Sequence, residues 1–335
     1  MSIEPKNLWL SNRRQFLQWG LGVGAGLGAG VAAWNLLENS RSSQSVVPDE
    51  IQSNLLKNSK DLQNPLIFLR NFDHGTLKQE NGRTIREFRV EARTSPLQLN
   101  KAVSMMTWNL NGQVPGPTFR ATEGDRIRVI FSNRAGHSHS LHFHGVHPAA
   151  MDGIKPVRNN QVFIYEFDAE PYGVHLYHCH ISPVTRHISK GLYGMFIVDP
   201  PQPRPQADEM VMIMGGYDVN EDRKNELFAF NGLPNYYNDN PIAIKQNQLV
   251  RLYLLNMIEY DPTVTFHIHA NFFQVYPTGM AQNPSQTTDV ITMGTAERHI
   301  LEFSYREPGM YMFHPHQDWI AESGCMGMFK VVENA

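Results

Sequence analysis

The sequence runs through the same series of motifs twice, and this internal repeat constrains the fold more than any other feature. Each series has an Asn-Gly pair, a strand-like run, two H-x-H motifs and a Gly-x-x-Gly-Met-Phe segment. The last three parts are LHFHG, YHCH and GLYGMFIV in the first half, and FHIHA, FHPH and GCMGMFKV in the second. A shared order of parts indicates two tandem copies of one folding unit.

The segments between these motifs have the pattern of strands. Runs such as RIRVIFSN, QVFIYEF, LVRLYLLN and HILEFSY are alternating or β-branched, and Gly, Pro and Asn separate them. A proline-rich run, Asp199–Gln206, divides the two halves. We therefore predict an all-β chain of two tandem Greek-key β-sandwich domains, at residues 65–200 and 207–335.

Composition limits the function classes. With 335 residues, 41% of them hydrophobic, the chain is long enough to build two cores. Its formal net charge of −3 gives no basis for binding nucleic acid or an anionic membrane surface. The unusual count is 15 histidines against 2 cysteines. A disulfide between Cys179 and Cys325 is the simplest use of the cysteines, and metal ligation is the alternative.

Residues 1–34 have the features of a targeting segment. Arg13 and Arg14 precede a Gly/Ala-rich, mildly apolar stretch, which resembles a twin-arginine export signal. A short membrane anchor is the alternative, although so much glycine makes a poor transmembrane helix. Residues 35–64 are polar and are expected to form a linker. We expect export by a twin-arginine-type route to the periplasm or the extracytoplasmic face, with the segment either cleaved or kept as an anchor.

One cysteine lies inside the densest histidine motif. Cys179 stands between His178 and His180, and His187 follows a few residues later. A thiolate and two imidazoles in a trigonal site suit copper, and the candidates are Cys179, His187 and His139. In a strand, His178 and His180 share one face while Cys179 points to the other. One strand could then serve different coppers on its two faces, with its own peptide links as an electron path.

The motifs HSLHFHG, HCHISPVTRH, HIHA and HPH together resemble the four copper motifs of multicopper oxidases. The chain length resembles the small two-domain, laccase-like branch, which has its mononuclear copper in domain one. The resemblance covers most of residues 100–335. It implies two cupredoxin-like domains and four copper ions per functional unit, namely one type 1, one type 2 and two type 3.

The resemblance also assigns the copper ligands. Type 1 copper would be held by His139, Cys179 and His187. Thiolate ligation explains the histidines that flank Cys179, whereas a disulfide explains neither. The trinuclear cluster would take four histidines from each domain, with His142 and His267 on the type 2 copper; the full set is His142, His144, His178, His180, His267, His269, His314 and His316.

Domain two keeps the paired histidines and lacks the other three ligands. The residues that align with the three type 1 ligands are Val264, Pro315 and Ile320. If the three type 1 ligands form a site separate from the paired histidines, they should be absent together, as they are here. We therefore predict that domain two holds no mononuclear copper.

The axial position of the type 1 site is predicted to be Leu192. Members of the family with an axial methionine have it five residues after the second histidine, and Leu192 occupies that place. Met195 is nearby, but domain two has Met328 at the matching position, so Met195 is expected to be a core residue. Leucine cannot ligate, so the site resembles the high-potential laccase type. Cys325 aligns with Leu192 and is expected to be a buried free thiol.

The implied reaction couples oxidation of a small reducing substrate to four-electron reduction of dioxygen to water. The substrate would be a phenol, an aromatic amine or a metal ion. A carboxylate would supply protons, and Asp152 resembles the family position for that role; a turn-forming role before a glycine is the alternative. Asp318 and Glu322 follow the last motif, where the family's aspartate position is Ser323.

Three other functions were weighed against an oxidase of organic substrates. A copper nitrite reductase has the same two-domain plan, but its pattern has aspartate where His142 stands and no histidine at His180. An electron carrier or copper-sequestering protein would not need the trinuclear ligands. An oxidase of Cu(I), Fe(II) or Mn(II) is a variant, and the scattered methionines are explained by ordinary core filling.

The resemblance finally implies an assembly. The trinuclear site needs ligands from both domains, and the small oxidases pair domain one of one subunit with domain two of the next. Such a heterologous contact must close into a ring. We therefore expect a homotrimer with trinuclear sites at the subunit interfaces.

Overall fold

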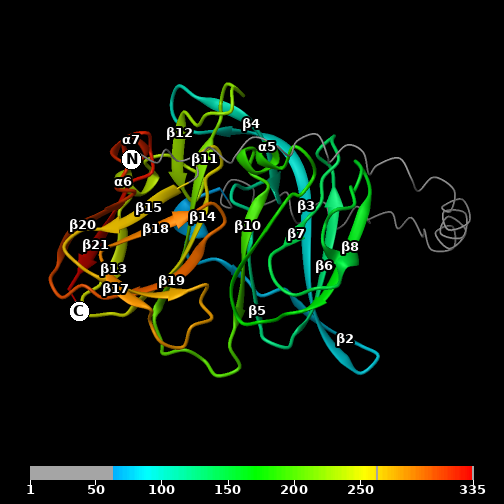
Figure 1. The fold of residues 1–335 in the computed structure, drawn as a ribbon, viewed down its shortest axis with the longest axis horizontal. Coiled ribbons are helices and arrows are strands. Elements are labelled where there is room, and N and C mark those ends of the chain that lie inside the picture. The colour runs from blue at the N-terminus through cyan, green and yellow to red at the C-terminus, as the bar shows by residue number, and fades with distance from the viewer. Residues whose placement is uncertain (1–62, 262, 334–335) are drawn as a thin grey trace, which may run out of the picture. The chain divides into compact units, whose positions relative to one another are not determined.

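The computed structural model describes residues 63–261 and 263–333, and these are mostly β. The predicted export segment at 1–34 and most of the predicted linker at 35–64 lie outside the described residues. Four mixed sheets form two cupredoxin-like domains, which confirms the predicted fold class. Figure 1 shows their strands as one cyan-to-green group and one yellow-to-red group. Within the described ranges, no helix has the length and apolar character needed to cross a membrane.

Domain one consists of two sheets. Sheet 1a has the strand order β1 (Phe72–Asp73), β5 (Thr118–Thr122), β10 (Tyr193–Asp199), β9 (Gly173–His178) and β7 (His142–Phe143). Sheet 1b has the order β2 (Thr76–Glu80), β3 (Arg83–Gln98), β6 (Arg126–Asn133) and β8 (Val162–Asp168), and β3 also pairs with β4 (Ser104–Leu110). Two short helices lie in the connections, η1 (Ala149–Met151) and α5 (Val184–Ser189).

Domain two repeats this plan. Sheet 2a has the strand order β13 (Ile242–Lys245), β21 (Gly327–Val332), β20 (Gly309–His314), β15 (Thr263–Ile268) and β18 (Val290–Gly294). Sheet 2b has the order β12 (Leu227–Phe230), β11 (Asp208–Tyr217), β14 (Val250–Met257), β19 (Arg298–Phe303), β16 (Phe273–Pro277) and β17 (Gln286–Thr288). Its short helices are α6 (Tyr236–Asp239) and α7 (Asp318–Glu322).

The repeat seen in the sequence is preserved in strand register. Strand β5 pairs in parallel with β10 as β13 does with β21, and β9 pairs antiparallel with β10 as β20 does with β21. His142 lies opposite His178 in domain one, and His267 lies opposite His314 in domain two. The two H-x-H motifs of each half are therefore neighbours on adjacent strands.

Strand β9 shows how alternation separates two environments. Tyr177 and Cys179 belong to the core of domain one, where Tyr177 stacks on Phe119 with ring centroids 4.9 Å apart. Val174 and Leu176 point the opposite way, into a second core shared with domain two. Each such fully buried apolar side chain stabilises the fold by roughly 1.5–3 kcal/mol. A strand buried on both faces is thus a rigid support for the residues at its end.

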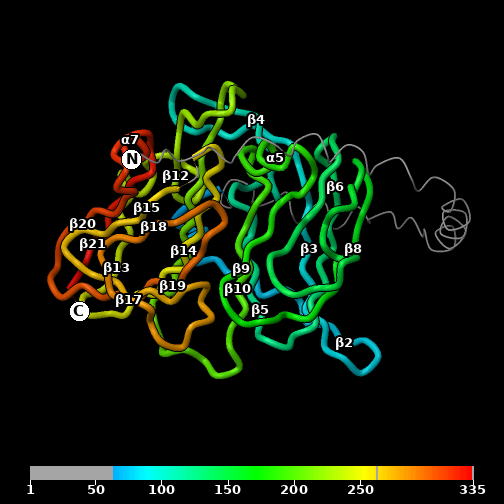
Figure 2. Tube along the Cα trace, viewed as in Figure 1, coloured from blue at the N-terminus to red at the C-terminus, as the bar shows by residue number. Residues whose placement is uncertain are grey.

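The shared core joins sheet 1a of domain one to sheet 2b of domain two. Val174 and Leu176 of β9 belong to one buried cluster with Val211 of β11 and Tyr253 of β14. Beside this core, Arg120 of β5 donates hydrogen bonds to Glu209 of β11. Figure 2 shows the chain passing from β10 to β11 between the two domains, along the predicted proline-rich boundary.

The first described residues contact both domains. Helix α4 (Pro65–Phe68) begins after Asn64, whose side chain accepts a hydrogen bond from Leu66 N. The carbonyl oxygen of Pro65 accepts a hydrogen bond from Tyr237, and Leu69 belongs to the core of domain two. The prediction begins domain one at residue 65, and in the structure Phe68 of α4 also packs in the core shared by the two domains before the chain enters sheet 1a.

Candidate metal centres

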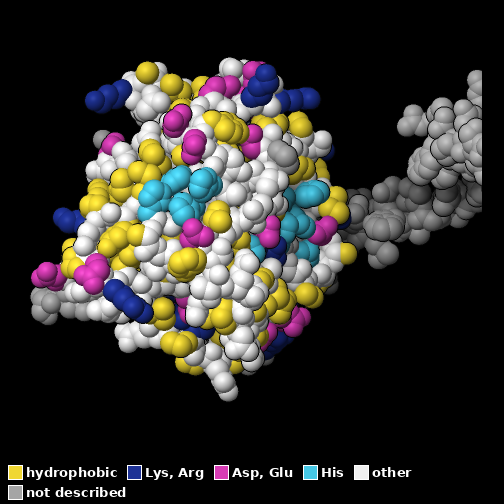
Figure 3. Space-filling model, turned by 60° about the vertical axis from the view of Figure 1, so that its left-hand side comes forward, with side chains coloured by type: hydrophobic (Ala, Val, Ile, Leu, Met, Phe, Trp, Pro, Cys, Tyr) yellow, Lys and Arg dark blue, Asp and Glu magenta, His cyan; other side chains and the backbone are white. Residues whose placement is uncertain are grey.

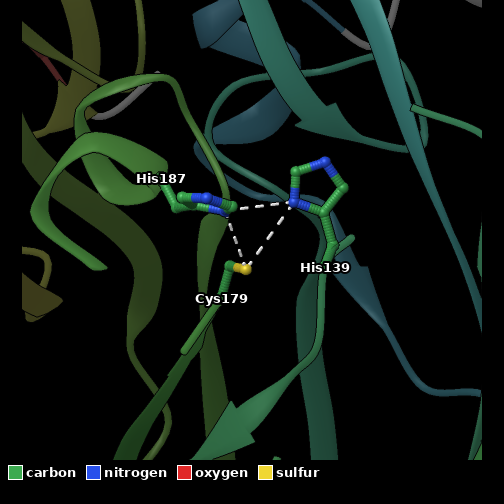
Figure 4. Close-up of side chains that lie close together, drawn as sticks. All are labelled: His139, Cys179 and His187. Atoms are coloured by element: carbon green, nitrogen blue, oxygen red, sulfur yellow. Dashed lines mark hydrogen bonds between the residues drawn. The ribbon is translucent and has the colours of Figure 1, made fainter. Parts of the chain in front are cut away.

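Three predicted ligands of a mononuclear site converge in domain one. His139 precedes β7 and is fixed by a β-bridge to Val157; Cys179 directly follows β9, and His187 lies in α5. Cys179 Sγ is 3.1 Å from His187 Nδ1 and 3.7 Å from His139 Nδ1, and the two Nδ1 atoms are 3.1 Å apart. Figure 4 shows the three side chains pointing toward one another from separate elements.

The donor set fits a copper ion. His139 and Cys179 are fully buried and His187 is 5% exposed. Burial, with a smaller contribution from neighbouring imidazole charge, lowers the pKa of His139 to about 3. Both imidazoles are therefore neutral, with lone pairs available for a metal. Burial alone raises the pKa of the Cys179 thiol, and a bound cation would reverse that effect. One sulfur and two imidazole nitrogens in a triangle match a trigonal copper site.

Leu192 occupies the position beside this triangle. Its amide donates to the carbonyl oxygen of His187 (3.2 Å), and its carbonyl oxygen accepts from the amide of Cys179 (3.0 Å). The Leu192 side chain belongs to the same buried cluster as Cys179. Met195 lies instead in the core shared by the two domains, as expected of a core residue. A hydrocarbon at this place provides no fourth donor, which disfavours a tetrahedral zinc site.

Four histidines form a second cluster on the other face of β9. The ring centroid of His142 lies 5.0 Å from His144, 5.2 Å from His178 and 5.0 Å from His180. His144 Nε2 and His178 Nε2 are 3.2 Å apart. Nδ1 of His178 lies 3.0 Å from the carbonyl oxygen of Cys179. Because a carbonyl oxygen only accepts hydrogen bonds, Nδ1 carries the proton and Nε2 keeps a free lone pair.

Asp152 orients His142. Nδ1 of His142 lies 2.9 Å from the Asp152 carbonyl oxygen and 3.1 Å from its carboxylate. Two acceptors at Nδ1 place the proton there, so that Nε2 is the metal-binding nitrogen. Asp152 also follows η1 directly and precedes Gly153, whose φ is +76°. Asp152 therefore both forms a turn and lies beside the histidine cluster, so the two predicted roles do not exclude each other. Its role in proton transfer stays a prediction.

Domain two repeats this histidine cluster. The ring centroid of His267 lies 5.0 Å from His269, 5.6 Å from His314 and 5.3 Å from His316. His269 Nε2 and His314 Nε2 are 3.0 Å apart. Among the four, His314 is fixed as His178 is, with its Nδ1 2.7 Å from the carbonyl oxygen of the next residue.

Asp289 plays the same part in domain two that Asp152 plays in domain one. His267 Nδ1 lies 2.8 Å from the Asp289 carbonyl oxygen and 3.7 Å from its carboxylate. Sequence analysis missed Asp289, because it lies much further along the chain from its histidine than Asp152 does. Of the carboxylates named near the last motif, Asp318 acts electrostatically on His314, and Glu322 is exposed.

The end of β20 lacks a mononuclear donor set. Cys325 N donates to the carbonyl oxygen of Ile320 (3.2 Å), which matches the bond between Leu192 and His187 in domain one. The structure therefore aligns Ile320 with His187, as the motif alignment does. Ile320 and Val264 are fully buried in the core of domain two. Cys325 is a buried free cysteine, as expected, and Cys179 is also free.

The two four-histidine clusters are separate within one chain. In the described part of the protein, no set of three close ligand atoms combines histidines of both domains. Figure 3 shows histidine side chains reaching the surface in two distinct groups. His180 in the first cluster and His316 in the second are exposed. Each cluster therefore presents unsatisfied ligand nitrogens to whatever covers that surface.

Comparisons with known proteins identify the family of the chain. Two models with the description multicopper oxidase match residues 91–203 and 204–335. A solved multicopper oxidase is 46% identical, with a TM-score of 0.79, and the match covers 81% of this chain and 98% of that one.

Copper nitrite reductases are also related. The enzyme of Neisseria gonorrhoeae is 28% identical over 72% of this chain and 67% of its own. A solved copper nitrite reductase from Nitrosomonas europaea has a TM-score of 0.69 at 25% identity, over 74% of this chain and 94% of that one. Family models that match both domains, together with a solved relative at 46% identity, place the chain: it belongs to the multicopper oxidase family and is a copper oxidoreductase related to the copper nitrite reductases.

Proposed function

We propose that the protein is a laccase-like oxidase that takes electrons singly from a small reducing substrate and delivers them to dioxygen. Copper held by His139, Cys179 and His187 would supply one-electron transfer, and copper held by the eight clustered histidines would supply four-electron reduction of dioxygen to water. The observation that carries this proposal is the alternation at the end of β9. Cys179 faces the mononuclear triangle while the adjacent His178 faces the histidine cluster.

The chain itself holds the ligands in position, keeps water away from the mononuclear site and joins the two kinds of site through the peptide bond between His178 and Cys179. Both domain cores bury the strands that carry the ligands, so their side chains cannot relax away from the metal. The mononuclear donors have almost no contact with water, which keeps solvent from binding there. The carbonyl oxygens of Asp152 and Asp289 hold His142 and His267 in one tautomer, so that both present Nε2.

His142 favours dioxygen over nitrite as the acceptor. The nitrite reductase pattern has an aspartate where His142 stands, and the four-histidine set of domain one would then be incomplete. Here His142 contacts the rings of all three other members. Its carboxylate neighbour, Asp152, is in place to move a proton to or from that side of the cluster.

A cyclic homotrimer would bring the two clusters together, and the domain contact within one chain supports this arrangement. Sheet 1a packs on sheet 2b through Val174 and Leu176. The equivalent face of sheet 2a carries Met310 and Met312, and Met310 is 52% exposed. On sheet 1b, the counterpart of sheet 2b, Ile164 is 47% exposed. Repeating the same contact between subunits would cover both faces and join domain two of one chain to domain one of the next.

A repeated charge cluster supports the same contact. In sheet 2b, Arg251 lies between Glu209 and Glu302, and this trio meets Arg120 of domain one. In sheet 1b, Arg128 lies between Glu87 and Glu166 at the matching strand positions. Sheet 2a has two exposed cations, Lys245 and Lys330, and Lys330 lies opposite Met310 in register. The outer charge cluster of sheet 1b would therefore receive Lys330 of the next subunit.

Subunit complementation tests the assembly and the oxidase function together. His142→Ala/His144→Ala and His314→Ala/His316→Ala variants should each be inactive in dioxygen uptake. After exchange of subunits between the two, some interfaces pair two undamaged clusters, so part of the activity should return. His74→Ala, which removes an exposed histidine outside both clusters, is the matched control and should keep full activity. An active monomer in light scattering, or no recovery after proven exchange, would contradict the proposal.

Export is a separate part of the proposal. We infer from the sequence that Arg13 and Arg14 direct the chain through a twin-arginine-type route to the periplasm or the extracytoplasmic face. Replacing both with lysine should leave the protein in the cytoplasm, measured by cell fractionation and immunoblotting. Normal export of that variant would indicate another route or a simple anchor.

A further inference from the structure

The mononuclear ligands are almost out of reach of a reducing substrate. His139 and Cys179 are fully buried and His187 is 5% exposed, so a donor molecule cannot lie against either imidazole edge. Electron tunnelling falls steeply with distance, so the group that separates the donor from the ligands determines the rate of reduction. In this structure that group is the indole of Trp108, a residue that the motif analysis did not find.

Trp108 covers both histidine ligands. Its ring centroid lies 4.7 Å from His187 and 5.3 Å from His139. Apart from the contact between the two imidazoles, Trp108 makes the sole ring contact with either ligand in the described chain. The indole itself is partly exposed on the outer face of β4. It therefore has one side on the ligands and another accessible to solvent.

The surrounding contacts fix the indole in this position. The Trp108 amide donates to the carbonyl oxygen of Lys190, the residue that caps α5, so β4 is tied to the helix that carries His187. The guanidinium carbon of Arg186 lies 5.4 Å from the centroid of the Trp108 ring. Arg186 is held in turn by Glu221 at 2.7 Å. Such contacts reduce the rotamer freedom of the indole and keep its distance to His187 constant.

We propose that Trp108 is the electron-entry residue of the mononuclear centre and the stacking platform for an aromatic reducing substrate. The proposal rests on the proposed function, because it requires copper at His139, Cys179 and His187. The donor packs against the exposed part of the indole, beside the Arg186 guanidinium, and loses one electron, which reduces one cupric ion to cuprous. A phenol or aromatic amine donor releases its proton to water. Trp108 is chemically unchanged and serves only as the bridge.

The same contacts select the class of donor. The ring neighbours of Trp108 are the imidazoles of His137, His139 and His187, with the Arg186 guanidinium above it. Arg186 contacts one carboxylate, that of Glu221, which forms ion pairs with both Arg186 and Lys190. At the indole itself, a hydrated Cu(I), Fe(II) or Mn(II) ion would meet the Arg186 cation, and none of the contacts described for Trp108 is to a carboxylate. A planar, electron-rich aromatic donor can stack on the indole and is favoured.

Anaerobic stopped-flow reduction tests this proposal on the copper-loaded protein. Bleaching of the blue band by N,N-dimethyl-p-phenylenediamine reports electron entry without any step at dioxygen. Trp108→Leu should lower the second-order rate constant roughly tenfold, since one aromatic stacking contact is worth about that factor in binding. Trp108→Phe should restore most of the rate. The matched control is Trp319→Leu, which removes an exposed indole from α7 of domain two and should change nothing.

A binding measurement separates stacking from general damage. In the dithionite-reduced protein, saturation-transfer NMR with the redox-inert 1,4-dimethoxybenzene should detect contact in the parent and in Trp319→Leu, and none in Trp108→Leu. An unchanged or faster bleaching rate in Trp108→Leu would show that the indole is a shield and would overturn the proposal. Failure of the whole proposed function looks different, because no blue band would then form in the parent protein.

Discussion

The ends of β9 and β20 have the same backbone arrangement but carry different side chains on the face that points into their own domain. Both strands end in H-x-H, and both fix the first histidine through the carbonyl oxygen of the residue between, at 3.0 Å in domain one and 2.7 Å in domain two. Both continue into a short helix closed by the same backbone hydrogen bond, which is 3.2 Å long in each domain. The outward histidines are kept in both domains, whereas the inward thiolate and imidazole occur in domain one alone.

This difference teaches that the two faces of one strand can be specified independently. In domain two the inward positions are apolar, and Val264 and Ile320 belong to an ordinary hydrophobic core. In domain one the same positions bury three polar groups, which is unfavourable unless something satisfies them. A bound metal ion satisfies all three at once. The histidine clusters face outward, so they do not depend on whether the inward positions are apolar or polar. One domain can therefore lose the mononuclear site and keep its four histidines of the other copper site.

The largest expected effect comes from making domain one resemble domain two. His187→Ile copies the residue at the equivalent position and should abolish both the blue band and oxidase turnover, because the triangle loses one of its three donors. The metal-free variant should be as stable as the metal-free parent or more stable, since a buried polar group is replaced by an apolar one. Absorption spectroscopy, dioxygen uptake and urea unfolding measure these three results. A blue His187→Ile protein would show that another residue completes the site.

Removing the carboxylates beside His142 and His267 should have the next largest effect. Asp152→Asn and Asp289→Asn keep the backbone carbonyl oxygens that orient His142 and His267, so the clusters should still form. We expect Asp152→Asn to slow turnover roughly tenfold to a hundredfold, the usual cost of changing a residue behind a metal ligand. Asp289→Asn should cost less, because its carboxylate lies 3.7 Å from the imidazole against 3.1 Å for Asp152. Steady-state dioxygen uptake, in variants whose blue band is unchanged, measures the turnover rate. Equal losses of turnover in the two variants would contradict the expected difference between Asp152 and Asp289.

The buried histidines of domain one should make the metal-free protein sensitive to acid. Burial lowers the pKa of His139 and His144 to about 3 and of His178 and His187 to about 4. The unfolded chain binds protons at these histidines near pH 6.5, whereas the folded chain does not until pH 3 to 4. Their contribution to the free energy of unfolding is therefore present above pH 6.5 and is lost as the pH falls toward 4.

Urea unfolding of the copper-free protein between pH 7 and pH 5 measures this effect. His187→Ile should reduce the pH slope by about one proton, because one buried histidine no longer titrates. A slope that is independent of His187 would contradict the account.

The smallest effect concerns the axial position. Leu192→Met would add a weak thioether ligand and should lower the reduction potential of the mononuclear centre, while the similar volume of the two side chains keeps the core intact. Cys325→Met places the same thioether at the equivalent position in domain two and should leave the potential unchanged. Met195→Leu should also leave it unchanged, because Met195 packs in the core between the domains. Redox titration of the blue band compares all three variants.

Much of this arrangement could be predicted from the sequence because it rests on local spacing. Strand alternation placed His178 and Cys179 on opposite faces, and the repeat separated the two kinds of site. Other residues were beyond such reasoning, since their contacts depend on tertiary structure. Asp289 reaches His267 from the residue before β18, the strand that pairs with β15, and Trp108 of β4 reaches His187 in α5. The packing of α4 is another example: Phe68 lies in the core shared by the two domains and Leu69 in the core of domain two, and chain order does not show which core a short segment packs on.

The copper content of a single variant tests the central claim most directly, namely that the inward and outward faces of β9 serve separate centres. Cys179→Ser should lose the blue band and one of the four copper ions per chain, and should keep the type 2 signal in its paramagnetic resonance spectrum. Pro315→Ser, the same change at the equivalent position of domain two, should keep all four. A Cys179→Ser protein that stays blue, or that loses the type 2 signal together with its colour, would show that the two faces do not serve separate centres.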